Sequence, residues 1–266
     1  MHIHSLHIYP VKSLAGHSVQ TAELAQRGFV NDRRWMLVDE NGRFISQRTH
    51  PILCRWQASV VGEDLVLKQL DTGEELTITN AQDENGEWLD VQVWNDAFKA
   101  RLVSSVTEQQ LSNYLGFNCR LVYLSENSHR PVEEAYAKAG EEVSFADGYP
   151  YLIANTASLK DLSQRHGSEL SMERFRPNIV VAGEQAYEED NWQQLKIGTS
   201  TFRLPKPCSR CNMITIDPQT ADENPGVFQT LATYRMQERK VRFGMNACWE
   251  GTTMEKLQVG DTVLNV

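Results

Sequence analysis

The chain has 266 residues, of which 41% are hydrophobic and 23% charged, and these proportions are typical of a globular protein with one large or two small domains. Its formal net charge of -9 excludes a broad nucleic-acid-binding surface, because binding a phosphate backbone needs clustered Lys and Arg. No apolar run approaches the ~20 residues that span a bilayer, and the N-terminal segment lacks the pattern of a secretory signal. The sequence therefore predicts a cytoplasmic protein that binds neither nucleic acid polymer nor membrane.

The first hundred residues are predicted to be mainly β. Four segments show the alternation of apolar residues expected of strands, at residues 6–11, 33–48, 64–79 and 88–103. Asn41-Gly42 is a strong hairpin-turn signal inside the second segment, and Asp71-Thr72-Gly73 marks a turn inside the third.

Helix signals are fewer and lie in the rest of the chain. Thr107 and Gln110 have the spacing of a capping box, and Gly116 is the expected end of the helix that follows. A second helix is predicted from a cap at Asn155 to Gly167. Further strands are expected at residues 175–183, 192–204 and 257–266, with a short helix at 228–237. The predicted fold is mainly β (α+β), with two β-barrel-like domains at residues 1–110 and 120–266 and a few short helices.

Several conspicuous side chains are interpreted as structural. Cys54, Cys119 and Cys248 are predicted to be packed, and all five cysteines are expected to be thiols in a reducing cytosol. The tryptophans are scattered along the chain rather than striped, so most are interpreted as core or half-buried anchors. They are Trp35, Trp56, Trp88, Trp94, Trp192 and Trp249.

The pair Cys208-x-x-Cys211, in KPCSRCNMITIDP, raises four possibilities. A structural zinc is disfavoured because it needs four ligands and neither a second CxxC nor an HxxxH is present. A redox dithiol is disfavoured because that chemistry uses a CxxC at a helix N-terminus, whereas NMITIDP is β-like. From the residues alone, two interpretations stay open: two core cysteines at a strand edge, or a thiolate that binds a soft metal.

Six motifs in chain order extend over nearly the whole sequence. They are YPVKS (Tyr9–Ser13), DRRWMLVD (Asp32–Asp39), FADGYPYLIAN (Phe145–Asn155), ERFRPNIVV (Glu173–Val181), KPCSRC (Lys206–Cys211) and VGD (Val259–Asp261). With these motifs the chain resembles the MOSC family with its N-terminal companion domain. This family of molybdenum-cofactor enzymes includes the mitochondrial amidoxime-reducing component and bacterial N-hydroxylated-base reductases.

The resemblance implies the ligands of a molybdenum-pterin cofactor (Mo-molybdopterin). In the family the second cysteine of the CxRC motif supplies a thiolate to molybdenum, which places that role at Cys211 and leaves Cys208 as a neighbour. The matching positions for the phosphate tail are Lys12, Ser13, Arg33 and Arg176, since arginine grips phosphate with two donors and lysine acts as a point charge. The remaining cofactor-binding positions are Asp147, Gly148, Tyr149, Asn178, Ser209, Arg210 and Asn246.

The function implied by the resemblance is reduction of N-hydroxylated compounds to amines or amidines. The chain has no CxxxxCxxC spacing for an iron–sulfur cluster, so electrons are expected from a separate flavin or iron–sulfur reductase. The competing hypothesis is a cofactor carrier without turnover, and a third is a metal-free fold whose CxRC is structural. The resemblance also implies pyridoxal phosphate binding, but only as a general label of this type of domain.

The expected arrangement follows from the spacing of these motifs. YPVKS and DRRW are distant in sequence from CSRC, so either residues 1–33 are woven into the C-terminal barrel or the site lies in a cleft between domains. A monomer is expected.

Overall fold

The computed structural model describes residues 1–133 and 135–266, and its fold is mainly β, as the sequence predicts. The chain forms two compact units, each built from separate stretches of sequence. The unit called C-terminal here contains Met1–Ile8, Ser18–Val30 and Tyr149–Val266. The unit called N-terminal contains Tyr9–His17 and Asn31–Gly148. The contiguous domain ranges 1–110 and 120–266 stay a prediction.

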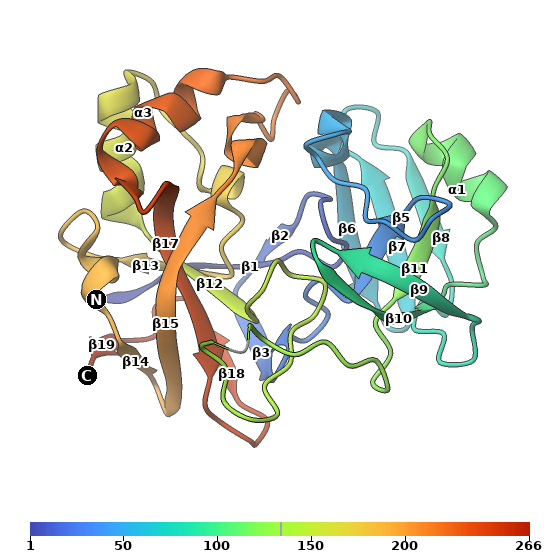
Figure 1. The fold of residues 1–266 in the computed structure, drawn as a ribbon, viewed down its shortest axis with the longest axis horizontal. Coiled ribbons are helices and arrows are strands. Elements are labelled where there is room, and N and C mark those ends of the chain that lie inside the picture. The colour runs from blue at the N-terminus through green and yellow to red at the C-terminus, as the bar shows by residue number, and fades with distance from the viewer. Residues whose placement is uncertain (134) are drawn as a thin grey trace. The chain divides into compact units, whose positions relative to one another are not determined.

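A nine-stranded sheet is the largest element of the structure (Figure 1). Its main path runs β19-β14-β15-β17-β12-β13-β1-β2, and β16 pairs with β17. Along the chain these strands are β1 (His2–Ile8), β2 (His17–Val19), β12 (Tyr151–Asn155), β13 (Ile179–Ala182), β14 (Gln194–Ile197), β15 (Ser200–Arg210), β16 (Met236–Gln237), β17 (Lys240–Trp249) and β19 (Val263–Asn265). Most pairs are antiparallel, while β12 and β13 are parallel.

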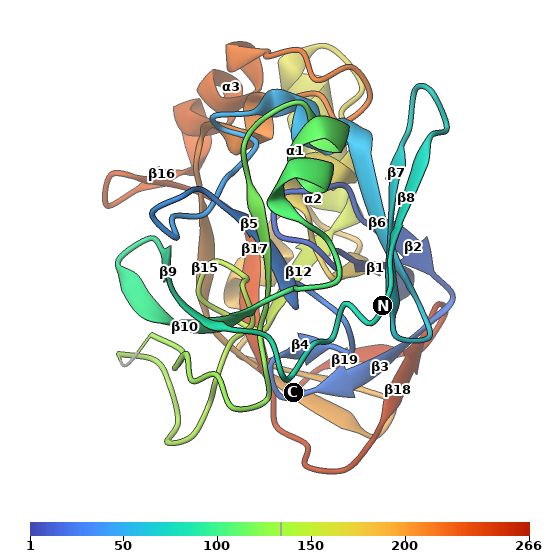
Figure 2. The same ribbon diagram turned by 90° about the vertical axis from the view of Figure 1, so that its right-hand side faces the viewer.

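A second, three-stranded sheet of the C-terminal unit has the order β18-β3-β4 (Figure 2). It comprises β3 (Thr21–Ala25), β4 (Gly28–Phe29) and β18 (Lys256–Gln258). Its buried residues Leu24, Phe29 and Leu257 belong to one hydrophobic core with Tyr151 and Phe202 of the large sheet. Phe29 and Phe202 both pack edge-on against the Tyr151 ring, so this core joins the two sheets.

Two of the three described α-helices, α2 (Thr156–His166) and α3 (Pro225–Arg235), lie together beside β17 (Figure 1). Their buried leucines share a hydrophobic cluster with Phe175 and Phe243, whose rings stack at 3.9 Å. Short 3₁₀ turns complete this unit: η2 (Met172–Phe175), η3 (Glu188–Asn191) and η4 (Asn212–Thr215). In the described part of the chain, no helix has the length and apolar character needed to cross a membrane.

In its described residues, the N-terminal unit contains two antiparallel sheets and one α-helix. The four-stranded sheet, in the order β5-β11-β10-β9, comprises β5 (Trp35–Val38), β9 (Trp88–Val93), β10 (Asp96–Leu102) and β11 (Arg120–Tyr123). The three-stranded sheet comprises β6 (Trp56–Val61), β7 (Asp64–Gln69) and β8 (Glu75–Ile78). The 3₁₀ turn η1 (Pro51–Arg55) precedes β6, and α1 (Glu108–Leu115) precedes β11. All four β5 residues are buried, because separate clusters cover its two faces.

The predicted helix caps are confirmed. Thr107 Oγ1 accepts the Gln110 backbone N–H at 3.1 Å, the Gln110 side chain returns the contact, and Gly116 ends α1 at φ 85°. Asn155 caps α2 by accepting the Ala157 N–H at 2.9 Å, and Gly167 ends that helix at φ 84°. Left-handed dihedrals of this kind favour glycine.

Three local predictions differ in part from the structure. The turn at Asn41-Gly42 is confirmed, since the Asp39 N–H donates to the Arg43 carbonyl and the Ile45 N–H to the Leu37 carbonyl, both at 2.9 Å, but the return arm is limited to single bridges at Arg43 and Phe44. The segment after Cys211 is the 3₁₀ turn η4 rather than β structure. The last helix ends at Arg235, and Met236–Gln237 pairs with β17.

The structural side chains follow expectation with one exception. Cys54, Cys119 and Cys248 are buried, and none of the five cysteines is in a disulfide. Four of the tryptophans are buried and Trp88 is half-buried. Trp94 differs, since 39% of its surface is exposed.

Candidate functional site

Lys12 and Asp147, both predicted to bind the cofactor, form an ion pair within the N-terminal unit. Lys12 Nζ donates to Asp147 Oδ1 at 2.7 Å and to the Phe145 carbonyl at 2.8 Å. The Lys12 side chain is buried, and burial lowers its pKa against the opposing effect of Asp147. The Asp147 side chain is 62% exposed, so this pair presents a carboxylate to solvent over a buried cation.

Ser13 and Arg33 are both buried, and both adopt left-handed backbone conformations, with φ 70° and 50°. Such dihedrals are unfavourable for residues other than glycine and persist where the surrounding structure holds them, often at functional sites. Arg33 Nη1 donates to both oxygens of the fully buried Asp32, at 2.9 and 2.7 Å, and its guanidinium lies 4.3 Å from the centre of the Tyr9 ring.

Backbone hydrogen bonds join the three motifs of this unit. The Arg33 N–H donates to the Tyr9 carbonyl at 2.8 Å, and the Phe145 N–H donates to the Arg33 carbonyl at 2.9 Å. The Lys12 N–H donates to Trp35 of β5 at 2.8 Å. YPVKS, DRRW and FADG are therefore neighbours although more than a hundred residues separate the first from the last.

In the C-terminal unit, predicted residues lie along one row of strands. The Asn178 N–H donates to the Leu152 carbonyl at 2.8 Å, and the Leu152 N–H donates back to Asn178 Oδ1 at 3.2 Å. Leu152 is in register with Asn246, whose Nδ2 donates to the Pro207 carbonyl at 3.4 Å. This row passes from the start of β13 through β12 and β17 to the CxRC segment of β15.

The CxRC segment lies at the end of β15. Cys208 and Cys211 are half-buried, Ser209 is exposed, and Cys211 immediately precedes η4. Arg210 Nη1 donates to Cys208 Sγ at 3.0 Å, while Nη2 donates to the Phe175 carbonyl at 2.8 Å. Arg210 therefore connects the end of β15, where Cys208 lies and after which Cys211 follows, to the neighbouring ERFRPN segment.

Arg176 follows Phe175 in the chain and resembles Ser13 and Arg33 in its burial and its backbone conformation. It is buried and left-handed, with φ 54°, at the end of η2. Tyr149 is also buried, and the Lys206 ammonium lies 5.2 Å from the centre of its ring.

Within each unit the structure brings most predicted residues together. Lys12, Ser13, Arg33, Asp147 and Gly148 belong to the N-terminal unit. Tyr149, Arg176, Asn178, Ser209, Arg210, Cys211 and Asn246 belong to the C-terminal unit.

Sequence reasoning missed two buried arginines beside these residues. Arg130 is 1% exposed, pairs with Asp96 at 2.9 Å, and donates to the Ser144, Ala146 and Asp147 carbonyls, so it fixes the FADG loop from behind. Arg174 is buried and pairs with Asp217. The sequence could have indicated Arg174, because this residue lies inside the ERFRPN motif. Arg130 lies in no distinctive pattern.

The chemical types of the predicted residues, which are cations and one thiolate, fit a molybdenum-pterin cofactor. Three cationic side chains, Lys12, Arg33 and Arg176, are buried in a protein whose net charge is -9. Asp147 pairs with Lys12 and Asp32 with Arg33, and cations of this kind also suit a phosphate group. Among residues 1–133 and 135–266 there is no group of three or more His, Cys, Asp and Glu side chains that could hold a metal ion alone. A single thiolate suits a metal whose other sulfur ligands come from the cofactor itself.

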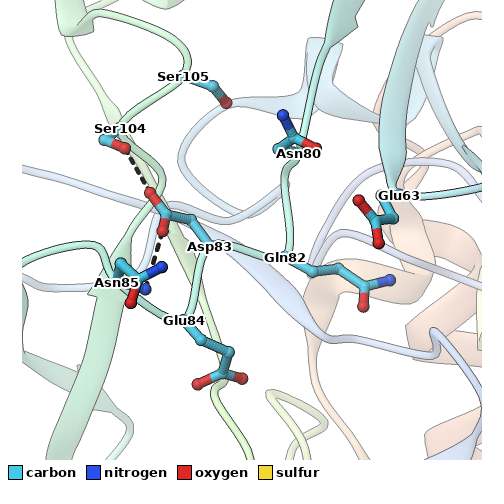
Figure 3. Close-up of a pocket in the computed structure, with 8 residues that line it drawn as sticks. All are labelled: Glu63, Asn80, Gln82, Asp83, Glu84, Asn85, Ser104 and Ser105. Carbon is cyan, nitrogen blue, oxygen red and sulfur yellow. Dashed lines mark hydrogen bonds between the residues drawn. The ribbon is translucent and has the colours of Figure 1, made fainter.

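A separate polar cavity of about 530 Å³ lies in the N-terminal unit and is lined by none of the predicted residues (Figure 3). Its lining is Glu63, Asn80, Gln82, Asp83, Glu84, Asn85, Ser104 and Ser105. Asp83 accepts hydrogen bonds from Ser104 and from the Asn85 N–H, and these bonds lower its pKa. The carboxylate thus holds its own loop together.

The family comparisons cover most of this chain. The model of the MOSC N-terminal beta barrel domain matches residues 1–118, and the model of the MOSC domain matches residues 140–264. Mitochondrial amidoxime-reducing component 1 of Mus musculus is 30% identical over 87% of this chain and 70% of its own length. The chain belongs to the MOSC family.

Other relatives are longer or more distant. Molybdenum cofactor sulfurase of Homo sapiens is 32% identical over 98% of this chain, which spans only 32% of that protein's length. Among solved structures, the YUAD protein from Bacillus subtilis aligns with 98% of this chain and 93% of its own, at a TM-score of 0.46 and 9% identity.

Proposed function

We propose that the protein binds a molybdenum-pterin cofactor through the Cys211 thiolate and reduces N-hydroxylated compounds with electrons from a separate flavin or iron–sulfur reductase. The observation that carries the proposal is the set of buried, left-handed polar residues, Ser13, Arg33 and Arg176, at positions predicted to bind phosphate. Backbone strain and buried charge both lower the stability of a protein. Binding of an anionic ligand at these residues would explain why the protein keeps them. The similarity to an amidoxime-reducing component supports the reductase assignment.

Each group has a definite task in this proposal. Cys211 holds the metal, and Arg210 positions it by anchoring the end of β15 to Cys208 and Phe175. Lys12, Ser13, Arg33 and Arg176 bind the phosphate, with the other predicted residues on the pterin. When bound, the cofactor supplies two-electron redox chemistry. Overall, an amidoxime, two protons and two electrons give an amidine and water.

A cofactor carrier is the second candidate, favoured by the similarity of 98% of this chain to part of a molybdenum cofactor sulfurase. A carrier needs the same binding residues but no turnover. The presence or absence of reduction therefore distinguishes the two.

The test compares wild type, Cys211→Ser and Cys208→Ser, all expressed in a host that makes the cofactor. Molybdenum and pterin content are measured first, and benzamidoxime reduction with a chemical electron donor second. We expect near-equimolar metal and activity in wild type, loss of both metal and activity in Cys211→Ser, and retention of metal in Cys208→Ser. A cofactor-loaded but inert wild type would establish the carrier, and a metal-free wild type would refute both candidates.

A further inference from the structure

Trp94 is a bulky aromatic residue in an unfavourable and exposed position. It is the first residue of the two-residue turn between β9 and β10, with φ 56°. Such turns favour Asn, Asp or Gly, because a large side chain is strained in the left-handed region. Its carbonyl accepts a hydrogen bond from Gln92 Nε2 at 2.8 Å, while 39% of its surface is exposed. A turn with a purely structural role needs neither the ring nor the exposure.

Two side chains gather around the Trp94 ring. The Phe44 ring lies 5.4 Å from it between centres, tilted by 59°. The exposed Arg48 guanidinium lies 4.3 Å from the centre of the indole and 5.7 Å from the centre of the Phe44 ring. We call Phe44, Arg48 and Trp94 the aromatic platform.

The aromatic platform is connected to the candidate site through Asp147. Trp94 Nε1 donates to Asp147 Oδ1 at 3.1 Å, and the same oxygen accepts from Lys12 Nζ at 2.7 Å. The Lys12 ammonium in turn lies 5.1 Å from the centre of the Phe44 ring. All five residues belong to the N-terminal unit, so this adjacency is internal to one compact body.

The chemistry of the platform selects one kind of ligand. An exposed aromatic residue such as Trp94 binds flat groups by stacking, and the Asp147 carboxylate beside it can accept an N–H from the ligand. Arg48 already lies over the indole, so its charge disfavours a second cation on the same ring. The platform therefore suits a planar, uncharged group that carries N–H donors. An aromatic amidoxime has this character, whereas the corresponding amidine is a cation at neutral pH.

We propose that Trp94, with Phe44 and Arg48, binds the planar part of an uncharged aromatic N-hydroxylated substrate and thereby sets the preference for aromatic over aliphatic substrates. This inference rests on the proposed function for the identity of the substrate. The binding step itself does not depend on turnover.

The test measures ligand binding to the oxidised, cofactor-loaded protein by calorimetry, without any reductant. Benzamidoxime is compared with acetamidoxime, which lacks the ring, and with cationic benzamidine. We expect Trp94→Ala to weaken benzamidoxime binding about tenfold, which corresponds to about 1.4 kcal/mol, with acetamidoxime binding unchanged. Trp94→Phe keeps a ring and should recover most of the affinity. Arg48→Gln should improve benzamidine binding about threefold, because it removes the competing charge.

The matched control is Trp88→Ala. Trp88 stands at the start of β9 and also has an arginine over its ring, with Arg101 at 3.7 Å, but it is half-buried. Its substitution should leave benzamidoxime affinity unchanged. In turnover, Trp94→Ala should raise KM for benzamidoxime by the same factor as the binding constant and leave kcat unchanged.

The other outcomes overturn either the inference or the proposed function, and the two are distinguishable. Benzamidoxime binding that is absent from wild type, unchanged in Trp94→Ala, or equally weakened in Trp88→Ala would exclude the platform. Loss of molybdenum or pterin from Trp94→Ala would show that the ring holds the cofactor rather than the substrate. If wild type binds benzamidoxime through Trp94 but never reduces it, the proposed function fails and the binding surface stands.

Discussion

Asp32→Asn is expected to cost the protein about 3 kcal/mol of unfolding free energy. Asp32 is fully buried, and its carboxylate accepts two hydrogen bonds from Arg33 Nη1 and one from the Tyr9 N–H at 2.9 Å. Removing one partner of a buried ion pair costs about 3–5 kcal/mol, because the remaining charge stays desolvated. Asparagine preserves the shape and an acceptor for Tyr9, and Arg33 is 8% exposed, so the lower end of that range applies.

The assay is urea unfolding of the cofactor-free protein, followed by tryptophan fluorescence and far-UV circular dichroism. Two probes are needed because two units can unfold in separate transitions. Asp71→Asn is the matched control: it removes a carboxylate paired with Arg55 in the same unit, but that carboxylate is solvent-exposed and its loss should leave the midpoint unchanged.

A double-mutant cycle completes the test. Arg33→Met alone should also destabilise the protein, since it strands the buried Asp32 carboxylate, while Arg33→Met with Asp32→Asn should recover part of the loss. A cost below about 1 kcal/mol for Asp32→Asn, or simple additivity in the double variant, would refute the view that this pair is a desolvated charge pair.

Three further predictions concern other positions. Burial raises the pKa of the Cys119 thiol to about 12, so iodoacetamide at pH 8 should modify Cys208 and Cys211 in the folded, cofactor-free protein and spare Cys119, as read by peptide mass spectrometry. Burial also raises the pKa of Glu189 above its ordinary value of 4.5. As the pH rises from 4.5 through this raised pKa, the wild type should therefore lose stability relative to Glu189→Gln. A difference in Tm between the two proteins that does not change with pH would contradict this. Thr107→Ala removes the cap of α1 and should cost about 1 kcal/mol, measured by the urea midpoint, whereas equal stability would show that the capping box is dispensable.

Local signals in the sequence predict elements whose stabilising contacts lie within a few residues. Thr107, Gln110 and Gly116 define α1 by themselves, because an N-cap hydroxyl and a left-handed glycine act on their own turn. Asn41-Gly42 likewise reverses the chain, and Val38 pairs with Phe44 across the turn, but the return arm does not continue as a strand. The length of a strand depends on its partners elsewhere in the fold, which local propensity does not contain.

The same distinction between local signals and distant contacts applies to the candidate site. The resemblance of the motifs to the MOSC family predicts the roles of Cys211, Lys12 and the arginines, and these roles stay predictions. The left-handed backbone at Ser13, Arg33 and Arg176 is not visible in the sequence, because no glycine marks those positions and only the surrounding contacts hold them there. The exposure of Trp94 is likewise not visible in the sequence, since a single tryptophan between strands carries no sign of which way it faces.

The sequence by itself determined the mainly β character, the ends of α1 and α2, the thiol state of the cysteines and the set of motifs that place the chain in its family. These follow from residue type and short-range periodicity, which are properties of the unfolded chain as much as of the folded one. Only the tertiary structure decided that Lys12 pairs with Asp147 and Arg130 clamps the FADG loop, and that Trp94 shares the same carboxylate. These contacts join residues up to 135 positions apart, and they form because burial of charge demands a partner wherever the fold can supply one.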